Sequence, residues 1–241
     1  MTEPTPTPTP THTPVPKKGT RGVLNKADAA ALNDTEQVVA TAQNASYSAP
    51  LATRGITAAS VMTLATDIDT CRKNAAQAAQ MDFTAQQRTQ LEGAAKKDLL
   101  QSMRYFQSAA KLKFPTDKNA QHEFFIGQDL AGANRPDLET FCRGMISKLV
   151  TEPLTGQGVT AAEIAELSIK FAAWQEADTA QSDAQLAAQA LRVTVNTQLD
   201  SIKASRTQIR LAANLQWPPT DKANGPIRKA FGLPANKPYN A

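Results

Sequence analysis

The stretch from Thr160 to Trp217 decides the fold: TAAEIAELSIKFAAWQEADTAQSDAQLAAQALRVTVNTQLDSIKASRTQIRLAANLQW. It contains neither glycine nor proline over 58 residues, and its larger apolar residues recur about every 3.5 positions. Residues at this spacing lie along one side of an α-helix. The stretch therefore predicts one helix of roughly 85 Å, since each residue adds about 1.5 Å. A hairpin near residues 179–183, where Ser182 or Asp183 would cap a second helix, is the alternative.

The same pattern occurs earlier in the chain, displaced by 103 residues. Residues 48–64 align with residues 151–167 without a gap, and seven of the 17 positions are identical. At the same offset, Phe114-Pro115 aligns with Trp217-Pro218. We interpret the match as an internal duplication, in which helical repeats 26–135 and 136–241 share a core with pseudo-two-fold symmetry.

Local residues explain the boundaries of the expected long helices. Gly55 and Gly158 permit a reversal of the backbone, and Thr57 and Thr160 supply an oxygen that caps the following helix. We expect Pro50 and its counterpart Pro153 to stop the preceding helix in each repeat.

The composition supports an all-α fold and argues against a β-sandwich or barrel. Aromatic residues make up only 5% of the 241 residues, and alanine dominates the apolar positions. Taken together, the pattern predicts an elongated, alanine-rich helical bundle of the coiled-coil type. No stretch approaches 18 consecutive apolar residues, so we expect no membrane insertion.

Residues 1–25 differ from the rest. Proline occupies every second position over much of residues 4–16, and Lys17, Lys18 and Arg21 follow. Proline at this density prevents helix and sheet, so we expect a disordered Thr-Pro arm with a basic linker. The arm is either a solubilising leader or a docking peptide for a partner that recognises proline. Because no secretory signal precedes it, the expected location is cytoplasmic.

Residues that would carry catalysis or bind a cofactor do not form a recognised pattern. The two histidines, His12 and His122, lack a partner at metal-binding spacing, and Cys71 and Cys142 match no metal or redox motif. Asp67 and Asp69 are two residues apart, so they point in different directions on a helix. We expect no catalytic residue, no metal site and no cofactor. An enzyme with a site between the repeats is the weakest of three hypotheses.

The charge is segregated although the net charge is only +4. Residues 84–113 carry six basic and two acidic groups, and residues 137–183 carry three basic and eight acidic groups. One interpretation is that acidic and basic segments lie side by side within the molecule. A second is a basic surface for nucleic acid, and a third is a surface for an acidic protein. The candidate basic surface consists of Lys203, Arg206, Arg210, Lys222, Arg228 and Lys229.

The sequence therefore predicts a non-enzymatic structural or protein-interaction protein, with a protein partner or self-association. A nucleic-acid-associated helical protein that uses its basic faces is the alternative.

The Thr-Pro arm provides a first test. Deleting residues 1–16 should leave the thermal midpoint unchanged within error, because this segment has almost no apolar surface to bury. Thermal unfolding followed by circular dichroism checks this, with the full chain as the control. A fall of several degrees would show instead that the arm packs along the bundle.

Overall fold

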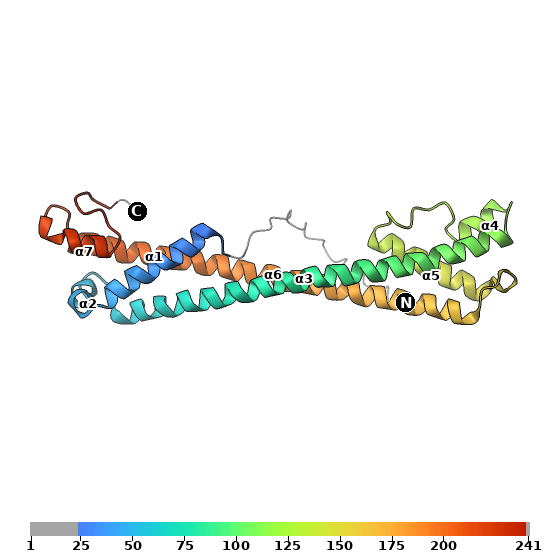
Figure 1. The fold of residues 1–241 in the computed structure, drawn as a ribbon, viewed down its shortest axis with the longest axis horizontal. Coiled ribbons are helices and arrows are strands. Elements are labelled where there is room, and N and C mark those ends of the chain that lie inside the picture. The colour runs from blue at the N-terminus through green and yellow to red at the C-terminus, as the bar shows by residue number, and fades with distance from the viewer. Residues whose placement is uncertain (1–23, 240–241) are drawn as a thin grey trace, which may run out of the picture.

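The computed structural model describes residues 24–239, and the predicted Thr-Pro arm lies outside these residues. The described part of the chain is an elongated all-α structure, which confirms the predicted fold class (Figure 1). Its helices are α1 (Lys26–Gln43), α2 (Ala45–Ala52), α3 (Ala58–Lys113), α4 (Lys118–Glu123), α5 (Arg135–Thr151), α6 (Ala161–Gln216) and α7 (Gly225–Ala230), with short 3-10 helices at Thr155–Gln157 and Lys222–Asn224.

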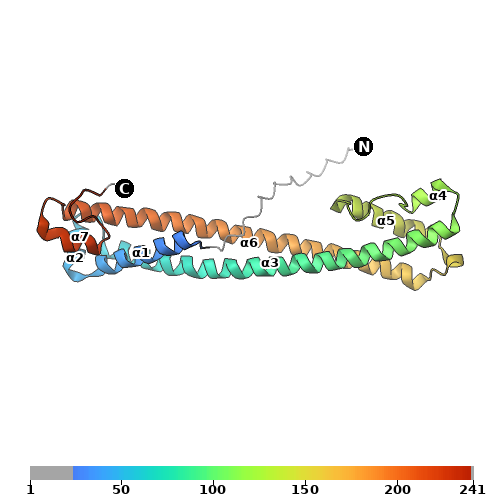
Figure 2. The same cartoon turned by 45° about the horizontal axis from the view of Figure 1, so that its top comes forward.

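Helices α3 and α6 form the body of the rod, and each contains 56 residues. They run side by side in opposite directions (Figures 1 and 2). At about 1.5 Å per residue, each is about 84 Å long. Because α6 is continuous through Ser182 and Asp183, the hairpin alternative is wrong.

The two long helices begin and end on the same residue types. The Thr57 and Thr160 side chains accept a hydrogen bond from the backbone N–H three residues later, at 3.1 Å and 3.2 Å. Gly55 and Gly158 precede them with φ of 84° and 83°, a conformation that glycine adopts without strain. The helices therefore have the boundaries that the local residues predict. The spacing of 103 residues holds at both ends, and the duplication remains our interpretation of it.

One predicted helix boundary is wrong. We expected Pro50 to stop the first helix, but α1 already ends at Gln43 and Pro50 lies within α2. Asn44 makes the break, since its backbone is extended and its side chain accepts a hydrogen bond from Ser46 N at 2.9 Å. Pro50 is the sixth residue of α2, so the helix lacks one backbone hydrogen bond there and ends two residues later, at Ala52.

One end of the rod is a bundle in which α1 packs across the first half of α3 and the second half of α6. A hydrophobic cluster fills it, with Tyr47, Trp217 and Phe231 in mutual aromatic contact. Its largest aliphatic members include Leu32, Leu51, Leu64, Ile68, Leu199 and Ile202.

At the other end, α5 packs across the second half of α3 and the first half of α6. The cluster here includes Phe106, Phe124, Leu138, Met145, Leu167, Phe171 and Trp174. Each cluster draws residues from both expected repeats. Residues 26–135 and 136–241 therefore pack against each other at both ends of the rod, with a separate hydrophobic cluster at each end.

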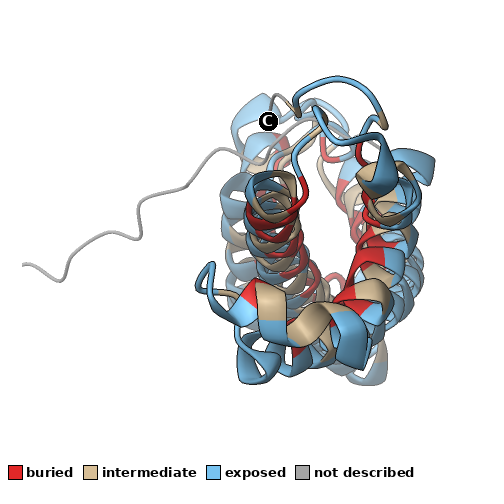
Figure 3. Cartoon of the chain, turned by 90° about the vertical axis from the view of Figure 1, so that its left-hand side faces the viewer, coloured by how far each residue is buried: buried red, intermediate tan, exposed pale blue. Residues whose placement is uncertain are grey.

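Between the two clusters, the rod consists of α3 and α6 alone (Figure 2). The buried residues of this section are small: Ala78 and Ala188 are at most 4% exposed. Polar contacts cross the same section, from Gln181 to Thr89 at 3.3 Å and from Arg192 to Asp82 at 3.2 Å. Viewed along the rod, buried residues occupy the facing sides of the helices (Figure 3). Small and polar side chains therefore replace a large apolar core at the centre.

Within residues 24–239, no helix has both the length and the apolar character that crossing a bilayer requires.

The length of the rod can be measured in solution. For the chain without residues 1–16, small-angle scattering should give a maximum dimension of at least about 80 Å. The radius of gyration should be about 24 Å or more, the value for a rod of that length. A compact domain of this size would give about 18 Å, which would contradict continuous long helices.

The capping box at the start of α6 predicts a local effect on stability. The Thr160 hydroxyl accepts from Glu163 N, and the Glu163 carboxylate accepts from Thr160 N at 2.8 Å. Thr160→Ala should lower the free energy of unfolding by about 1 kcal/mol, measured by urea denaturation. Thr197→Ala, an exposed position inside the same helix, is the matched control and should be neutral or slightly stabilising. Equal effects of the two substitutions would contradict a stabilising cap.

Candidate interaction surfaces

Three of the six predicted surface cations are neutralised inside the molecule. Lys203 lies 2.9 Å from Asp28, and Arg206 and Arg210 lie 2.7 Å and 2.6 Å from the two oxygens of Asp34. Both carboxylates belong to α1, so these ion pairs hold α1 against α6. Acidic and basic segments thus lie side by side here, in agreement with the first interpretation of the charge pattern.

Arg228 is buried and serves the structure of the C-terminal turn. Its guanidinium donates hydrogen bonds to the carbonyl oxygens of Trp217 at 2.6 Å, Pro234 at 2.8 Å and Lys237 at 2.8 Å, and to Asn214 Oδ1 at 3.0 Å. Burial lowers the pKa of this group. A guanidinium can satisfy several carbonyls at once because its five N–H groups point outward in one plane. The side chain fixes the segment after α6 and is not accessible to a partner.

Lys222 and Lys229 complete the predicted set. Both are exposed, and neither forms an ion pair with the residues that the structure describes. The structure thus leaves two of the six cations free on the surface, at the end of the rod that carries α7. Binding of nucleic acid by these residues stays a prediction.

Ion pairs also hold the opposite end. Lys148 on α5 contacts Glu123 and lies 2.9 Å from Glu152, and Lys113 on α3 lies 3.3 Å from Glu152. The hydrogen bonds to Glu123 and Glu152 raise the pKa of Lys148, and those from Lys148 and Lys113 lower the pKa of Glu152. Arg135, the first residue of α5, pairs with Asp178 of α6. Charge complementarity therefore positions α5 as it positions α1.

Asp178 is the one buried acidic residue among those described. Its burial raises its pKa, an effect that Arg135 opposes and Glu92 reinforces. Glu92 is itself the acceptor for Trp174 Nε1 at 2.9 Å. This small polar cluster lies where the α5 bundle gives way to the bare helix pair. It fixes the start of α5.

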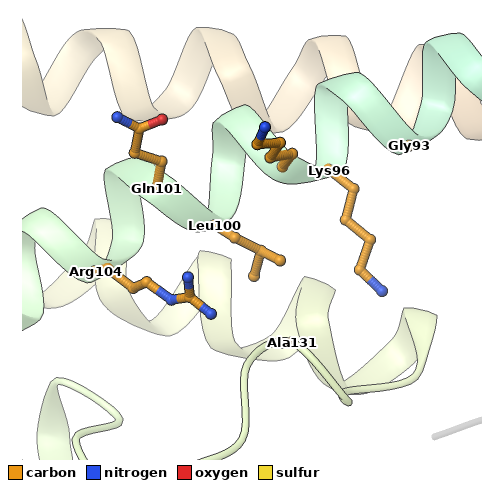
Figure 4. Close-up of a pocket in the computed structure, with 7 residues that line it drawn as sticks. Gly93, Lys96, Leu100, Gln101, Arg104 and Ala131 are labelled. Carbon is orange, nitrogen blue, oxygen red and sulfur yellow. The ribbon is translucent and has the colours of Figure 1, made fainter.

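A basic groove that the sequence pattern alone did not predict runs along α3. It has a volume of about 440 Å³ and is lined by Gly93, Lys96, Lys97, Leu100, Gln101, Arg104 and Ala131. Lys96, Leu100 and Arg104 are four residues apart, and their side chains point towards the loop that carries Ala131 (Figure 4). The excess of basic residues over 84–113 was the available signal. That excess alone does not predict a groove, because the opposite wall is formed by the loop from α4 to α5, whose position the sequence does not give.

The outer faces of the long helices expose large apolar side chains near the centre. Phe83 and Leu91 on α3, and Leu186 and Val193 on α6, are 56–65% exposed. Phe83 and Leu186 are separated by the same 103 residues as the helix boundaries. These side chains lie where no third helix covers the pair.

Groups capable of covalent or metal chemistry are not brought together in the described residues. Cys71 and Cys142 are buried, belong to different hydrophobic clusters and form no disulfide. His122, Asp67 and Asp69 are exposed. Among residues 24–239, no group of three histidine, cysteine, aspartate or glutamate side chains could hold a metal ion.

Comparison of the chain with protein-family models, with curated proteins and with solved structures found no match.

The buried thiols give a test of the packing. Burial raises the pKa of Cys142 to about 12, and burial also raises the pKa of Cys71. At pH 8 a Cys142 with this pKa is almost entirely a thiol, whereas roughly one in ten free cysteines with the ordinary pKa of 9.0 is a thiolate. Alkylation of the native protein should therefore be slow at both residues and rapid in denaturant. Fast labelling of either residue in the native protein would remove it from the core.

The same pKa shift predicts a dependence of stability on pH. The folded protein holds the Cys142 proton more tightly than the unfolded chain, so the stabilisation is complete below the ordinary thiol pKa of 9.0. It is lost as the pH rises from there towards about 12. The thermal midpoint should fall between pH 8 and pH 10, and less steeply in Cys142→Ala. Identical slopes would show that Cys142 does not contribute.

Proposed function

We propose that the protein is a non-enzymatic structural or protein-interaction rod, in which α3 and α6 act as an antiparallel coiled-coil spacer. The observation that carries this proposal is the bare central section of the helix pair, which exposes Phe83, Leu91, Leu186 and Val193. Exposed apolar surface on a protein is a common feature of sites that bind other proteins.

The distribution of stabilising contacts supports a spacer. The two hydrophobic clusters and most of the ion pairs lie at the ends, where α1 and α5 thicken the rod. At the centre, α3 and α6 are held together by small alanine side chains and a few polar contacts. A rod of this construction holds its two ends at a fixed distance, since each long helix spans about 84 Å without interruption.

Two finer interpretations belong to the same proposal. The equal helix lengths, the matching caps and the constant 103-residue offset support descent from a duplicated helical unit. The two buried free thiols favour a reducing location such as the cytoplasm, where cysteines seldom pair.

Nucleic-acid association is the second candidate. The observation that favours it is the exposure of Lys222 and Lys229 without an ion pair among the described residues. The pairing of Lys203, Arg206 and Arg210 with α1 weighs against it, because each paired cation would have to give up a carboxylate to bind phosphate.

The two candidates separate in one experiment of two parts. A photo-cross-linking residue at Phe83 or Leu186 should give discrete protein adducts in cells, whereas one at Lys222 should give few. In parallel, fluorescence anisotropy with duplex and single-stranded DNA should show no binding at about 0.15 M salt, where exposed charges are strongly screened. DNA binding that survives at this salt concentration, with no adducts at Phe83 or Leu186, would favour the second candidate.

A further inference from the structure

The basic groove of α3 contains cations that lack a partner within the molecule. Lys96, Lys97 and Arg104 line it, and Lys111 continues the row seven residues beyond Arg104. None of these four forms an ion pair with the described residues, although Arg72 and Lys113 on the same helix do. The groove therefore concentrates positive charge that is not used to hold the fold together.

Among the described residues, the facing wall forms no ion pair with these cations. Its acidic residue, Asp129, accepts hydrogen bonds from the backbone N–H groups of Ala131 at 3.2 Å and Gly132 at 3.0 Å. That carboxylate is thus engaged in shaping its own loop. Leu100, partly exposed between Lys96 and Arg104, gives the groove an apolar floor.

The outer face of α6 carries a pattern that matches the groove. Ile169, Glu176 and Asp183 follow one another at intervals of seven residues, so they lie on one side of the helix. All three are exposed, and the two acidic side chains form no ion pair with residues 24–239. The positions around them are small and mostly exposed: Ala172, Ala173, Ala180 and Ala187.

The spacing of the charges is the same on both surfaces. Lys97 and Arg104 are seven residues apart, as are Glu176 and Asp183, and seven residues span about 10.5 Å of helix. When the two helices lie side by side in either direction, both pairs come opposite each other. In the antiparallel arrangement, which sets Glu176 against Arg104, Leu100 comes opposite Ala180, where a small side chain leaves room for it.

We propose that the basic groove of α3 in one copy of the chain docks on the Glu176–Asp183 face of α6 in a second copy. This inference rests on the proposed function, and names a second copy as the partner. Because the two surfaces differ, the contact is heterologous, and each copy keeps one surface free for a further copy. The protein then assembles side by side through complementary charge around an apolar contact.

Static and dynamic light scattering over a range of protein concentrations test this. At about 10 mM salt, where the screening length is about 30 Å, the mass should rise to at least twice that of the monomer. At about 1 M salt, where it is about 3 Å, the mass should return towards the monomer. A monomer at every concentration in low salt would overturn the proposal.

Charge-reversal variants locate the contact. Lys97→Glu with Arg104→Glu should abolish the increase in mass, and so should Glu176→Lys with Asp183→Lys. Each variant has a control with the same change in net charge at exposed positions elsewhere. The control for the groove is Lys73→Glu with Arg88→Glu, both on α3. The control for the acidic face is Asp69→Lys on α3 with Asp200→Lys on α6. The controls should associate as the unmodified chain does. Equal loss in a control and its matched variant would show that net charge alone is responsible, and would overturn the proposed contact.

Mixing the two charge-reversed variants gives the decisive readout. Each should be a monomer alone. Together they should form a complex, because the reversed groove of one variant and the reversed face of the other again carry opposite charges. Circular dichroism confirms that each variant is folded. No complex on mixing folded variants would overturn the proposal. The proposed function is tested separately: cross-linked adducts at Phe83 or Leu186 with proteins other than this chain would support it even if the two variants form no complex.

Discussion

The structure depends on the direct packing of α3 against α6 over two helices of 56 residues each. A helix pair of this length requires that no residue interrupt either backbone. Gly93 is the single glycine within α3, and its position is open enough that a side chain would meet no neighbour. At the centre, Ala78 and Ala188 let the backbones approach closely, while Thr89–Gln181 and Asp82–Arg192 contacts cross between the helices. Helices α1, α2, α4 and α5 each pack on one or both helices of this pair.

Helices α1 and α5 cover apolar side chains that the α3–α6 pair alone would leave exposed at its ends. Two helices alone bury little surface, and a pair this long has two ends at which apolar side chains such as Ile68 and Phe171 need cover. Helices α1 and α5 supply it, one at each end. Their orientation is set by charge as well as by burial, since Asp34 of α1 pairs with Arg206 and Arg210 while Arg135 of α5 pairs with Asp178. Each end becomes a three-helix bundle, and the centre stays bare.

Local chemistry made the long helices predictable from sequence. Threonine caps, positive-φ glycines and aromatic-proline stops act within a few residues, so Thr57, Gly55 and Phe114 could be assigned without a structure. The break at Asn44 was missed because an asparagine cap competes with a nearby proline that a short helix tolerates. The basic surface could not be judged at all. Arg206 and Arg210 are free or neutralised according to where α1 lies, and that placement depends on contacts between residues about 170 positions apart.

Pairing within the fold is therefore the property that distinguishes one cation of this protein from another. Arg210 and Arg104 have the same side chain and lie on the long helices, but Arg210 faces Asp34 whereas Arg104 faces a loop whose carboxylate is engaged elsewhere. The side chains of Arg206 and Arg210 are only 19% and 11% exposed, so they would have to leave a partly buried carboxylate in order to bind another one. An unpaired cation beside an apolar residue such as Leu100 has no carboxylate to give up. An acidic surface should therefore favour the groove of α3 over Lys203, Arg206 and Arg210 of α6, although these form the densest run of basic residues in the second half of the chain.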